Sequence, residues 1–265
     1  MSVRVEHPAP RVAELVMDRP AALNAVDAGQ ARALAGACAE LADAADLSVV
    51  ILSSAVPGAF CVGADLKERA GWGNAELLAS RPVSRAAYAA VLDLPMPTVA
   101  AVDGYALGGG CELALSCDLV VAGPAAVFGL PEVGVGLVPG GGGTQLLSRR
   151  IGSGRAADLL FTARRVDRDE AFRLGLADRA VTGDVRAAAL ELAVQVAGHS
   201  PVALRQAKWA LRAGADLDLP SALLVEDQAW RRAAAAPDRV EGIAAFTERR
   251  APRWPPPAAP GGPRR

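Results

Sequence analysis

Histidine is nearly absent from this 265-residue chain, which has only His7 and His199. Neither lies in a catalytic motif, and there is no Gly-x-Ser-x-Gly turn, so a serine or cysteine nucleophile assisted by histidine is not expected. A Walker A loop is missing too. The stretch that begins at Gly134 starts like a dinucleotide-binding fingerprint but carries Pro139 where the third glycine belongs. Any chemistry must therefore come from carboxylates and backbone amides.

Cysteine is sparse as well. The four cysteines, Cys38, Cys61, Cys111 and Cys117, lie in or beside apolar runs and form no C-x-x-C pair. We expect buried, reduced thiols and neither a disulfide framework nor a metal site. No uncharged apolar run approaches the roughly 18 residues of a membrane span, and the N-terminal segment has no apolar signal core. A cytoplasmic protein with no membrane partner is the expectation.

Net charge is also low, because 28 Lys and Arg oppose 29 Asp and Glu. A nearly neutral chain has no bulk electrostatic attraction for nucleic acid, so no nucleic-acid partner is expected. Hydrophobic residues make up 52% of the chain, which excludes a highly charged disordered protein. A chain of this length can bury a large core.

Apolar periodicity predicts an α/β part followed by a helical part. A helix capped by Asp27 is expected to run to about Asp43. The Pro- and Gly-rich segment 252–265 predicts a disordered tail. Strands are expected at 3–6, 12–17, 48–53, 98–102, 119–122 and 126–128. Further helices are expected at 144–150, 155–161, 168–174, 185–198, 201–213, 221–235 and 237–249.

The stretch from Thr98 to Asp118 combines a buried strand, three consecutive glycines at 108–110 and the start of a helix. This arrangement directs free backbone N–H groups and the positive end of a helix dipole at an anion or a polarised carbonyl. Glu112 stands one turn after the glycines, where it would repel a phosphate. An acid at this place suits a turn that holds a carbonyl oxygen while the carboxylate moves protons.

Two more glycine-containing loops occur at 57–69 and 128–145. The first of them and the 98–118 stretch each follow a buried strand, so both should emerge at the carboxyl edge of the sheet. Taken singly, the loops are ordinary turns, and Glu112 and Glu132 are first-turn acids stabilised by about 0.3–1 kcal/mol. Taken together, and without a histidine alternative, the two acids indicate a proton relay, because carboxylates that share a site have separated pKa values.

Several motifs, in order and at matching spacing, resemble the crotonase (enoyl-CoA hydratase/isomerase) superfamily over about residues 3–250. They are Arg19–Ala25, Phe60–Lys67, Ala106–Ala114 with Asp118, Phe128–Glu132, Pro139–Gln145 and Glu241–Arg250. The resemblance implies an α/β spiral of ββα units across 1–195 and a C-terminal helical trimerisation region across 196–251. It also implies a homotrimer or a homohexamer made of two trimers.

The same resemblance implies an acyl-CoA thioester as substrate, with coenzyme A as part of that substrate and no separate cofactor. The backbone N–H groups of Ala64 and Gly109 would form an oxyanion hole for the thioester oxygen. The residues implied in contacts with coenzyme A are Ala22, Leu23, Val62, Asp65, Leu66 and Lys67. Those implied in the acyl pocket are Leu130, Pro131, Leu137 and Gly140.

The carboxylates narrow the implied reaction, because relatives that resemble true hydratases carry Glu at both positions. We expect syn addition of water to a 2-enoyl-CoA, which gives a 3-hydroxyacyl-CoA. Glu112 would deprotonate the water that attacks the β-carbon, and Glu132 would protonate the α-carbon.

Three alternatives stay open. Motifs such as Ala64–Ala70 look closest to methylglutaconyl-CoA hydratases of leucine breakdown. A Δ3,Δ2-enoyl-CoA isomerase needs mainly Glu132. A non-catalytic acyl-CoA- or RNA-binding protein is the alternative of another class, although the stretch 71–78 lacks the lysines that such RNA binding uses. Ala21 stands where many relatives carry Lys, so a contact to the coenzyme A phosphates is either absent or supplied by Lys67 or the pair at 249–250.

Overall fold

The computed structural model describes residues 2–255, and its main sheet has six strands in the order β1-β2-β3-β5-β7-β10. β1 and β2 form an antiparallel hairpin, and every other neighbouring pair is parallel. β1 is longer than predicted, since it runs to Ala9 whereas the predicted strand ends at residue 6. The strands are β1 (Val3–Ala9), β2 (Val12–Met17), β3 (Val49–Ser54), β5 (Thr98–Val102), β7 (Leu119–Ala122) and β10 (Arg179–Ala180).

A second sheet has four strands in the order β4-β6-β8-β9. They are β4 (Ala59–Cys61), β6 (Tyr105–Leu107), β8 (Val127–Gly129) and β9 (Val166–Asp167). β4, β6 and β8 are parallel, and β9 runs antiparallel to β8. Along the chain, β3, β5 and β7 each enter the main sheet, and the strand that follows enters the second sheet before the chain becomes helical. This repetition is the spiral of ββα units that the resemblance to the crotonase superfamily implied.

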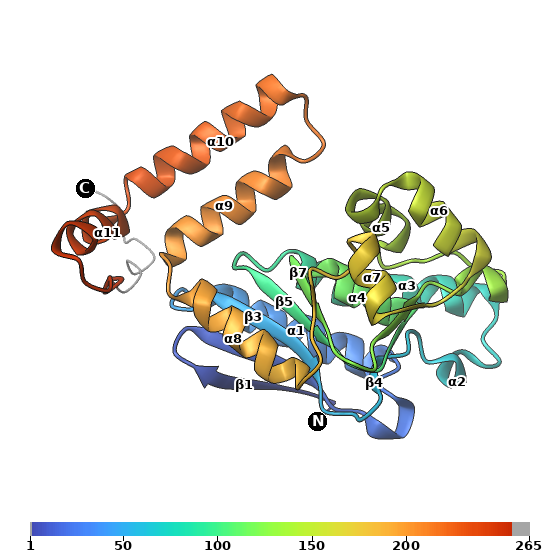
Figure 1. The fold of residues 1–265 in the computed structure, drawn as a ribbon. Helices are drawn as coiled ribbons and strands as arrows, with labels where there is room; N and C mark the ends of the chain where they lie inside the picture. The colour runs from blue at the N-terminus through green and yellow to red at the C-terminus, as the bar shows by residue number, and fades with distance from the viewer. Residues whose placement is uncertain (1, 256–265) are drawn as a thin grey trace.

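Helices cover both sheets (Figure 1). α1 begins where predicted, because the Asp27 side chain accepts a hydrogen bond from Gln30 N at 2.7 Å. The longest helix, α3, was not predicted, because Pro82 lies inside it and its buried residues come only from its last six. These helices are α1 (Ala28–Asp43), α2 (Leu66–Arg69), α3 (Asn74–Leu92), α4 (Gly109–Ser116), α5 (Gly143–Ile151), α6 (Ser153–Thr162), α7 (Arg168–Leu174) and α8 (Val185–Ala197), with 3₁₀ turns η1 (Pro20–Ala22) and η2 (Glu132–Val135).

Alternate residues of the parallel strands face two separate cores. Leu52 and Ala100 belong to the core that also contains residues of α1, α3 and α4. Ile51 and Val99 point to the opposite face of the sheet, which α8 covers (Figure 1). Because both faces are buried, these strands appear in the sequence as continuous apolar runs and not as alternating patterns.

The C-terminal part is an arm of α9 (Pro201–Gly214) and α10 (Leu219–Ala234), followed by α11 (Pro237–Glu248). α9 and α10 pack side by side and project away from the sheets (Figure 1). The chain bends by 105° between α8 and α9. No single helix in the described part of the chain is long and apolar enough to cross a membrane, although α8 and α9 meet that test jointly. The predicted division of the chain at 195–196 stays a prediction.

The first residues of the predicted tail lie against the fold. The indole of Trp254 donates to Gly198 O at 2.8 Å, and Arg11 Nη2 donates to Trp254 O at 3.0 Å. These bonds hold the first part of segment 252–265 against the fold. Residues 256–265 lie outside the described residues, so the tail stays a prediction there.

Candidate active site

The glycines of the 98–118 stretch let β6 run directly into α4. Gly108 has φ 53°, in the left-handed region, and α4 begins at the next residue with all eight of its residues buried. A Cβ on Gly110 would lie 1.9 Å from Cys61 O, so only glycine allows this helix to approach β4. The second and third of the three glycines therefore belong to the helix.

The loop after β4 lies against the start of α4. A Cβ on Gly63 would be 2.9 Å from Leu107 O and 3.1 Å from Gly109 N, so the two backbones touch. Ala64 follows Gly63 directly. Among the described residues, neither Ala64 N–H nor Gly109 N–H donates a hydrogen bond to the protein. Two free amides on touching turns are an arrangement that can hold one carbonyl oxygen.

Glu112 is held by the loop that precedes α5. Its side chain is buried at 2% exposure, and its Oε1 accepts hydrogen bonds from Gly141 N at 2.6 Å and Gly143 N at 2.8 Å. Burial raises the pKa of Glu112 above its ordinary value, whereas the backbone bonds and the positive charge of Arg81 oppose that rise. The amide donors favour the ionised carboxylate.

Glu132 opens η2 on the other side of the glycine turn. A Cβ on Gly108 would lie 3.1 Å from Glu132 Oε1, and Oε2 is buried without a hydrogen-bond partner in the described part of the chain. Burial, and then the negative charge of Glu112, raise the pKa of Glu132 to about 7. Two neighbouring carboxyl groups with such unlike surroundings can divide the roles of proton donor and proton acceptor.

The predicted acyl-pocket residues are partly brought together. Leu130 is buried, and its Cδ1 would lie 3.1 Å from a Cβ on Gly143, beside the group that holds Glu112. Gly140 lies in the same loop, and Pro131 caps η2. Leu137 is 44% exposed, on the segment that links η2 to this loop.

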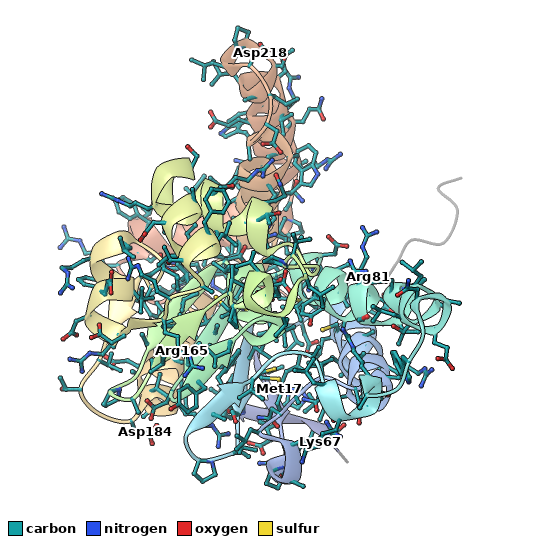
Figure 2. The ribbon with its side chains drawn as sticks, turned by 90° about the vertical axis from the view of Figure 1, so that its right-hand side faces the viewer. Met17, Lys67, Arg81, Arg165, Asp184 and Asp218 are labelled. Carbon is teal, nitrogen blue, oxygen red and sulfur yellow. The ribbon has the colours of Figure 1, made fainter. Side chains whose placement is uncertain are left out.

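The residues predicted to contact coenzyme A come from two adjacent segments. Val62 N donates to Leu23 O at 3.3 Å, which joins the β4–α2 loop to the end of η1, where Ala22 lies. Leu66 is 62% exposed, and Lys67 is an exposed cation on α2. Figure 2 shows Lys67 at the end of the molecule away from the tip of the arm.

Asp65 has a structural role in the same loop. It is 7% exposed, its side chain accepts from Lys67 N and Glu68 N, and it forms an ion pair with Arg19 at 2.8 Å. Its backbone N–H is bonded to Val26 O at 3.1 Å. Asp65 thus caps α2 and fixes the turn that presents Ala64.

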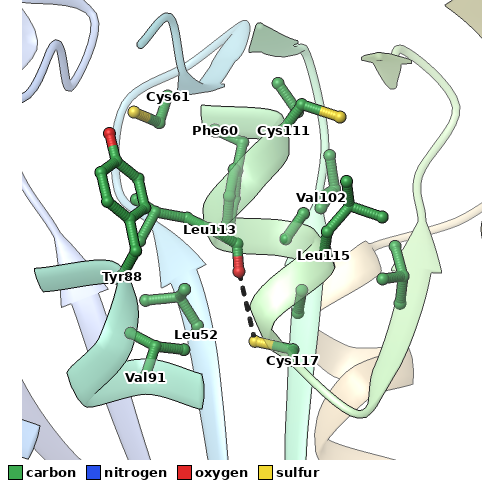
Figure 3. Packing of buried hydrophobic residues seen from close by; sticks show 14 of the residues in the cluster. Leu52, Phe60, Cys61, Tyr88, Val91, Val102, Cys111, Leu113, Leu115 and Cys117 are labelled. Atoms are coloured by element: carbon green, nitrogen blue, oxygen red, sulfur yellow. Dashed lines mark hydrogen bonds between the residues drawn. The ribbon is translucent and has the colours of Figure 1, made fainter. Parts of the chain in front are cut away.

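Two residues of α3 that sequence reasoning missed also reach the site. A Cβ on Gly109 would lie 2.2 Å from Tyr88 Oη, and one on Gly141 would lie 2.6 Å from Tyr88 Cγ. Figure 3 shows the buried Tyr88 beside Cys61. Arg81, labelled in Figure 2, donates from Nη2 to Gly140 O at 2.9 Å. Arg81 and Tyr88 are two helical turns apart, so they lie on the same side of α3. The sequence contains this spacing, but Pro82 argued against a helix there.

All four cysteines are free and buried, as predicted. Burial raises the pKa values of Cys38, Cys61 and Cys117 to about 12 and raises that of Cys111 as well. A thiol with such a pKa is protonated at neutral pH and is a poor nucleophile. The four thiols are therefore poor candidates for the chemistry of the site.

The fold is that of the crotonase superfamily, as its likeness to solved structures shows. An enoyl-CoA hydratase from Bacillus anthracis superposes with a TM-score of 0.93 at 37% identity, over 96% of this chain and 99% of that chain. Residues 9–256 match the family model described as "Enoyl-CoA hydratase/isomerase". The chain belongs to the enoyl-CoA hydratase/isomerase family and is an enzyme of the hydratase/isomerase class.

Similar proteins include two mitochondrial ones. The chain is 40% identical over 248 residues to the enoyl-CoA hydratase domain-containing protein 2 of Mus musculus. The aligned residues make up 92% of this chain and 84% of the relative. It is 44% identical over 210 residues to the methylglutaconyl-CoA hydratase of Rattus norvegicus. Here the aligned residues make up 77% of this chain and 67% of the relative. These relatives agree with an acyl-CoA thioester as the class of substrate.

Proposed function

We propose that the protein is a 2-enoyl-CoA hydratase, which adds water to the α,β double bond of its substrate and yields a 3-hydroxyacyl-CoA. One observation carries this proposal: two carboxyl groups of unlike surroundings flank the glycine turn at Gly109, whose free amide lies beside the free amide of Ala64 on the touching loop. The thioester oxygen would accept hydrogen bonds from Ala64 N–H and Gly109 N–H. Such donors act on the negative charge that develops on this oxygen, and each is typically worth about 2.7–4 kcal/mol of barrier.

The two glutamates would divide the proton transfers. Glu112, which its amide donors favour as an anion, would take a proton from the attacking water, whose hydroxyl group adds to the β-carbon. Glu132, whose pKa burial raises to about 7, would give its proton to the α-carbon as the enolate collapses. Both carboxyl groups then return to their starting states by proton exchange with solvent, so the overall reaction consumes one water and no other reagent.

The proposed coenzyme A path runs along Ala22, Leu23, Val62 and Leu66. Lys67 is the candidate for a phosphate contact, because Ala21 carries no charge. Arg250 is engaged within the chain, where it pairs with Glu241 at 2.6 Å and with Glu248 at 2.6 Å. Asp65 would act through the loop that it fixes.

A methylglutaconyl-CoA hydratase is the second candidate, favoured by the 44% identity to a relative of that name. The isomerase alternative leaves unexplained why two backbone amides hold Glu112. The RNA-binding alternative finds little support in a net charge of −1. A cytoplasmic location stays a prediction, since the relatives include mitochondrial proteins.

The test is a hydration assay on the purified protein, which follows the loss of conjugated thioester absorbance with crotonyl-CoA and 3-methylglutaconyl-CoA side by side. Glu132→Gln should lower kcat by roughly 10²–10⁴-fold while the fold and the binding of a saturated acyl-CoA are kept. Glu40→Gln, an exposed position on α1, is the control and should behave as wild type. Near-wild-type turnover by Glu132→Gln would overturn the assignment.

A further inference from the structure

Arg81 contacts the glycine loop that holds Glu112. Its Nη2 donates to Gly140 O at 2.9 Å, and a Cβ on Gly140 would lie 2.3 Å from Nη1, so the guanidinium packs directly on this glycine. Within residues 2–255, no carboxylate lies at ion-pair distance from Arg81. The half-buried position of Arg81 is therefore not due to an ion pair.

We propose that Arg81 is a positioning residue, whose bond to the Gly140 carbonyl orients the loop 140–143 toward Glu112. The positive charge of Arg81 also lowers the pKa of Glu112 and so favours its anionic form. The proposal rests on the proposed function of Glu112 as the base that activates water. Arg81 does not contact the reacting atoms in this scheme, and it acts through the loop and through its charge.

The loop needs such a restraint because it has no side chains of its own. Residues 140–143 are four consecutive glycines, and Gly142 has φ 114°, in the left-handed region. An unrestrained glycine loop loses much conformational entropy when it adopts a single shape. The guanidinium of Arg81 packs on Gly140, and the ring of Tyr88 packs on Gly141. One of the two amides that bind Glu112 is therefore that of a glycine that α3 restrains, Gly141, and the other belongs to Gly143 in the same loop.

Four titratable groups on the neighbouring elements interact electrostatically with Glu112. They are Arg81 and Tyr88 on α3, Cys111 on α4 and Glu132 on η2. Burial raises the pKa values of Tyr88 and Cys111, so both are neutral near pH 7. When Glu132 is ionised, its negative charge disfavours the ionisation of Glu112. Arg81 is the one cation of these four. Like the backbone amides, it lowers the pKa of Glu112 and so opposes the effect of burial.

The test compares Arg81→Met with Arg85→Met, a matched control at an exposed arginine one turn further along α3. Arg81→Met should lower kcat for crotonyl-CoA by roughly 10- to 100-fold, the scale of a small misplacement of a catalytic group, while KM changes by less than about twofold. The acidic limb of its kcat/KM profile should move to higher pH, because Glu112 then stays protonated over a wider range. Arg81→Lys should recover part of the pH shift, and Arg85→Met should match wild type.

A readout that does not need turnover separates this proposal from the proposed function. Carboxyl ¹³C NMR of glutamate-labelled protein, with Glu112→Gln to identify the resonance, should show Glu112 titrating at higher pH in Arg81→Met than in wild type. If the wild type fails to hydrate any enoyl-CoA, the proposed function is wrong, but this titration still tests the role of Arg81. Arg81→Gln replaces Arg81→Met if the latter does not fold.

Two results would overturn the role of Arg81. One is an unmoved Glu112 titration together with a kcat within twofold of wild type. The other is a loss confined to 3-methylglutaconyl-CoA, whose acyl chain ends in a carboxylate, while crotonyl-CoA is hydrated normally. That second result would mean that Arg81 binds the substrate and does not position Glu112.

Discussion

Glu112 and Glu132 carry the same chemical group and differ only in their surroundings. Glu112 is more deeply buried, yet it has two amide donors and Arg81 nearby. Glu132 is half-buried, and one of its oxygens has no partner among the described residues. Hydrogen bonds to the carboxylate, as well as depth of burial, therefore set the pKa values of these two groups.

The raised pKa of Glu132 predicts a pH-dependent stability. Its folded-state value is about 7, against an ordinary value of 4.5, so the folded chain holds this proton more tightly than the unfolded chain does. The resulting stabilisation is full below pH 4.5 and is lost as pH rises through 7. Glu132→Gln cannot ionise, so at pH 8 it should be more stable than wild type by about 1–2 kcal/mol, a value reduced for solvent screening.

Urea unfolding of both proteins at pH 4.5 and pH 8 measures this difference. The advantage of Glu132→Gln should shrink toward zero at the lower pH, because wild-type Glu132 is then protonated in the folded state and about half protonated in the unfolded state. Glu40→Gln is the control and should show no such pH-dependent advantage. A difference that stays constant between the two pH values would contradict the assigned pKa.

At the scale of elements, the site depends on α4 starting directly against β4. The close approach leaves no room for a side chain at Gly110, and it brings Gly109 beside the loop that carries Ala64. α3 adds a second support, since Tyr88 packs between Gly109 and Gly141. Helix starts and glycine contacts, more than loop sequence alone, therefore set the positions of the amides.

Gly110→Ala should for this reason destabilise the protein and damage the site. Its Cβ would meet Cys61 O at 1.9 Å, so β4 and α4 must separate, at a cost of about 1–3 kcal/mol. Gly36→Ala is the matched control, because Gly36 also lies in a helix but has nothing within 4 Å of its Cβ position. That control should be neutral or stabilise by up to about 1 kcal/mol. Thermal unfolding and hydration rates measure both, and equal behaviour of the two variants would refute the packing argument.

At the scale of the whole molecule, the C-terminal arm has two unlike sides. Lys208 of α9 is 7% exposed and anchors the arm, since its Nζ donates to Met96 O at 2.8 Å and pairs with Asp118 at 2.7 Å. Further out, α10 and α11 expose Leu224, Trp230 and Phe246 at 67%, 68% and 87%. Apolar surface of this kind is typical of a contact between subunits. The trimer or hexamer predicted from the sequence remains a prediction.

Light scattering coupled to size-exclusion chromatography tests the assembly. The wild type should elute with the mass of three or six chains, and Phe246→Asp should shift the distribution toward smaller species, because it places a charge in an apolar contact. Ala39→Asp adds the same charge at an exposed position of α1 and should leave the mass unchanged. A wild-type monomer, or a Phe246→Asp variant of unchanged mass, would count against an interface on α11.

The sequence by itself determined the features that depend on a few neighbouring residues. β3, β5 and β7 were predictable because strands buried on both faces are unbroken apolar runs. The start of α1 follows from its Asp27 cap, and the helices after residue 143 follow from their periodicity. The loops that carry Ala64, Gly109, Glu112 and Glu132 were identifiable from glycine and acid placement, whereas three-residue strands such as β4 and β6 are too short for a periodic pattern.

Only the tertiary structure decided which of these groups meet. Arg81 and Gly140 are 59 residues apart, and Glu112 and Gly141 are 29 residues apart, so no local pattern contains these contacts. The separated pKa values of the two glutamates likewise depend on burial and on donors from distant loops. The reason is physical: hydrophobic periodicity and helix caps act within one or two turns, whereas hydrogen-bond geometry and desolvation depend on every atom that folding brings near.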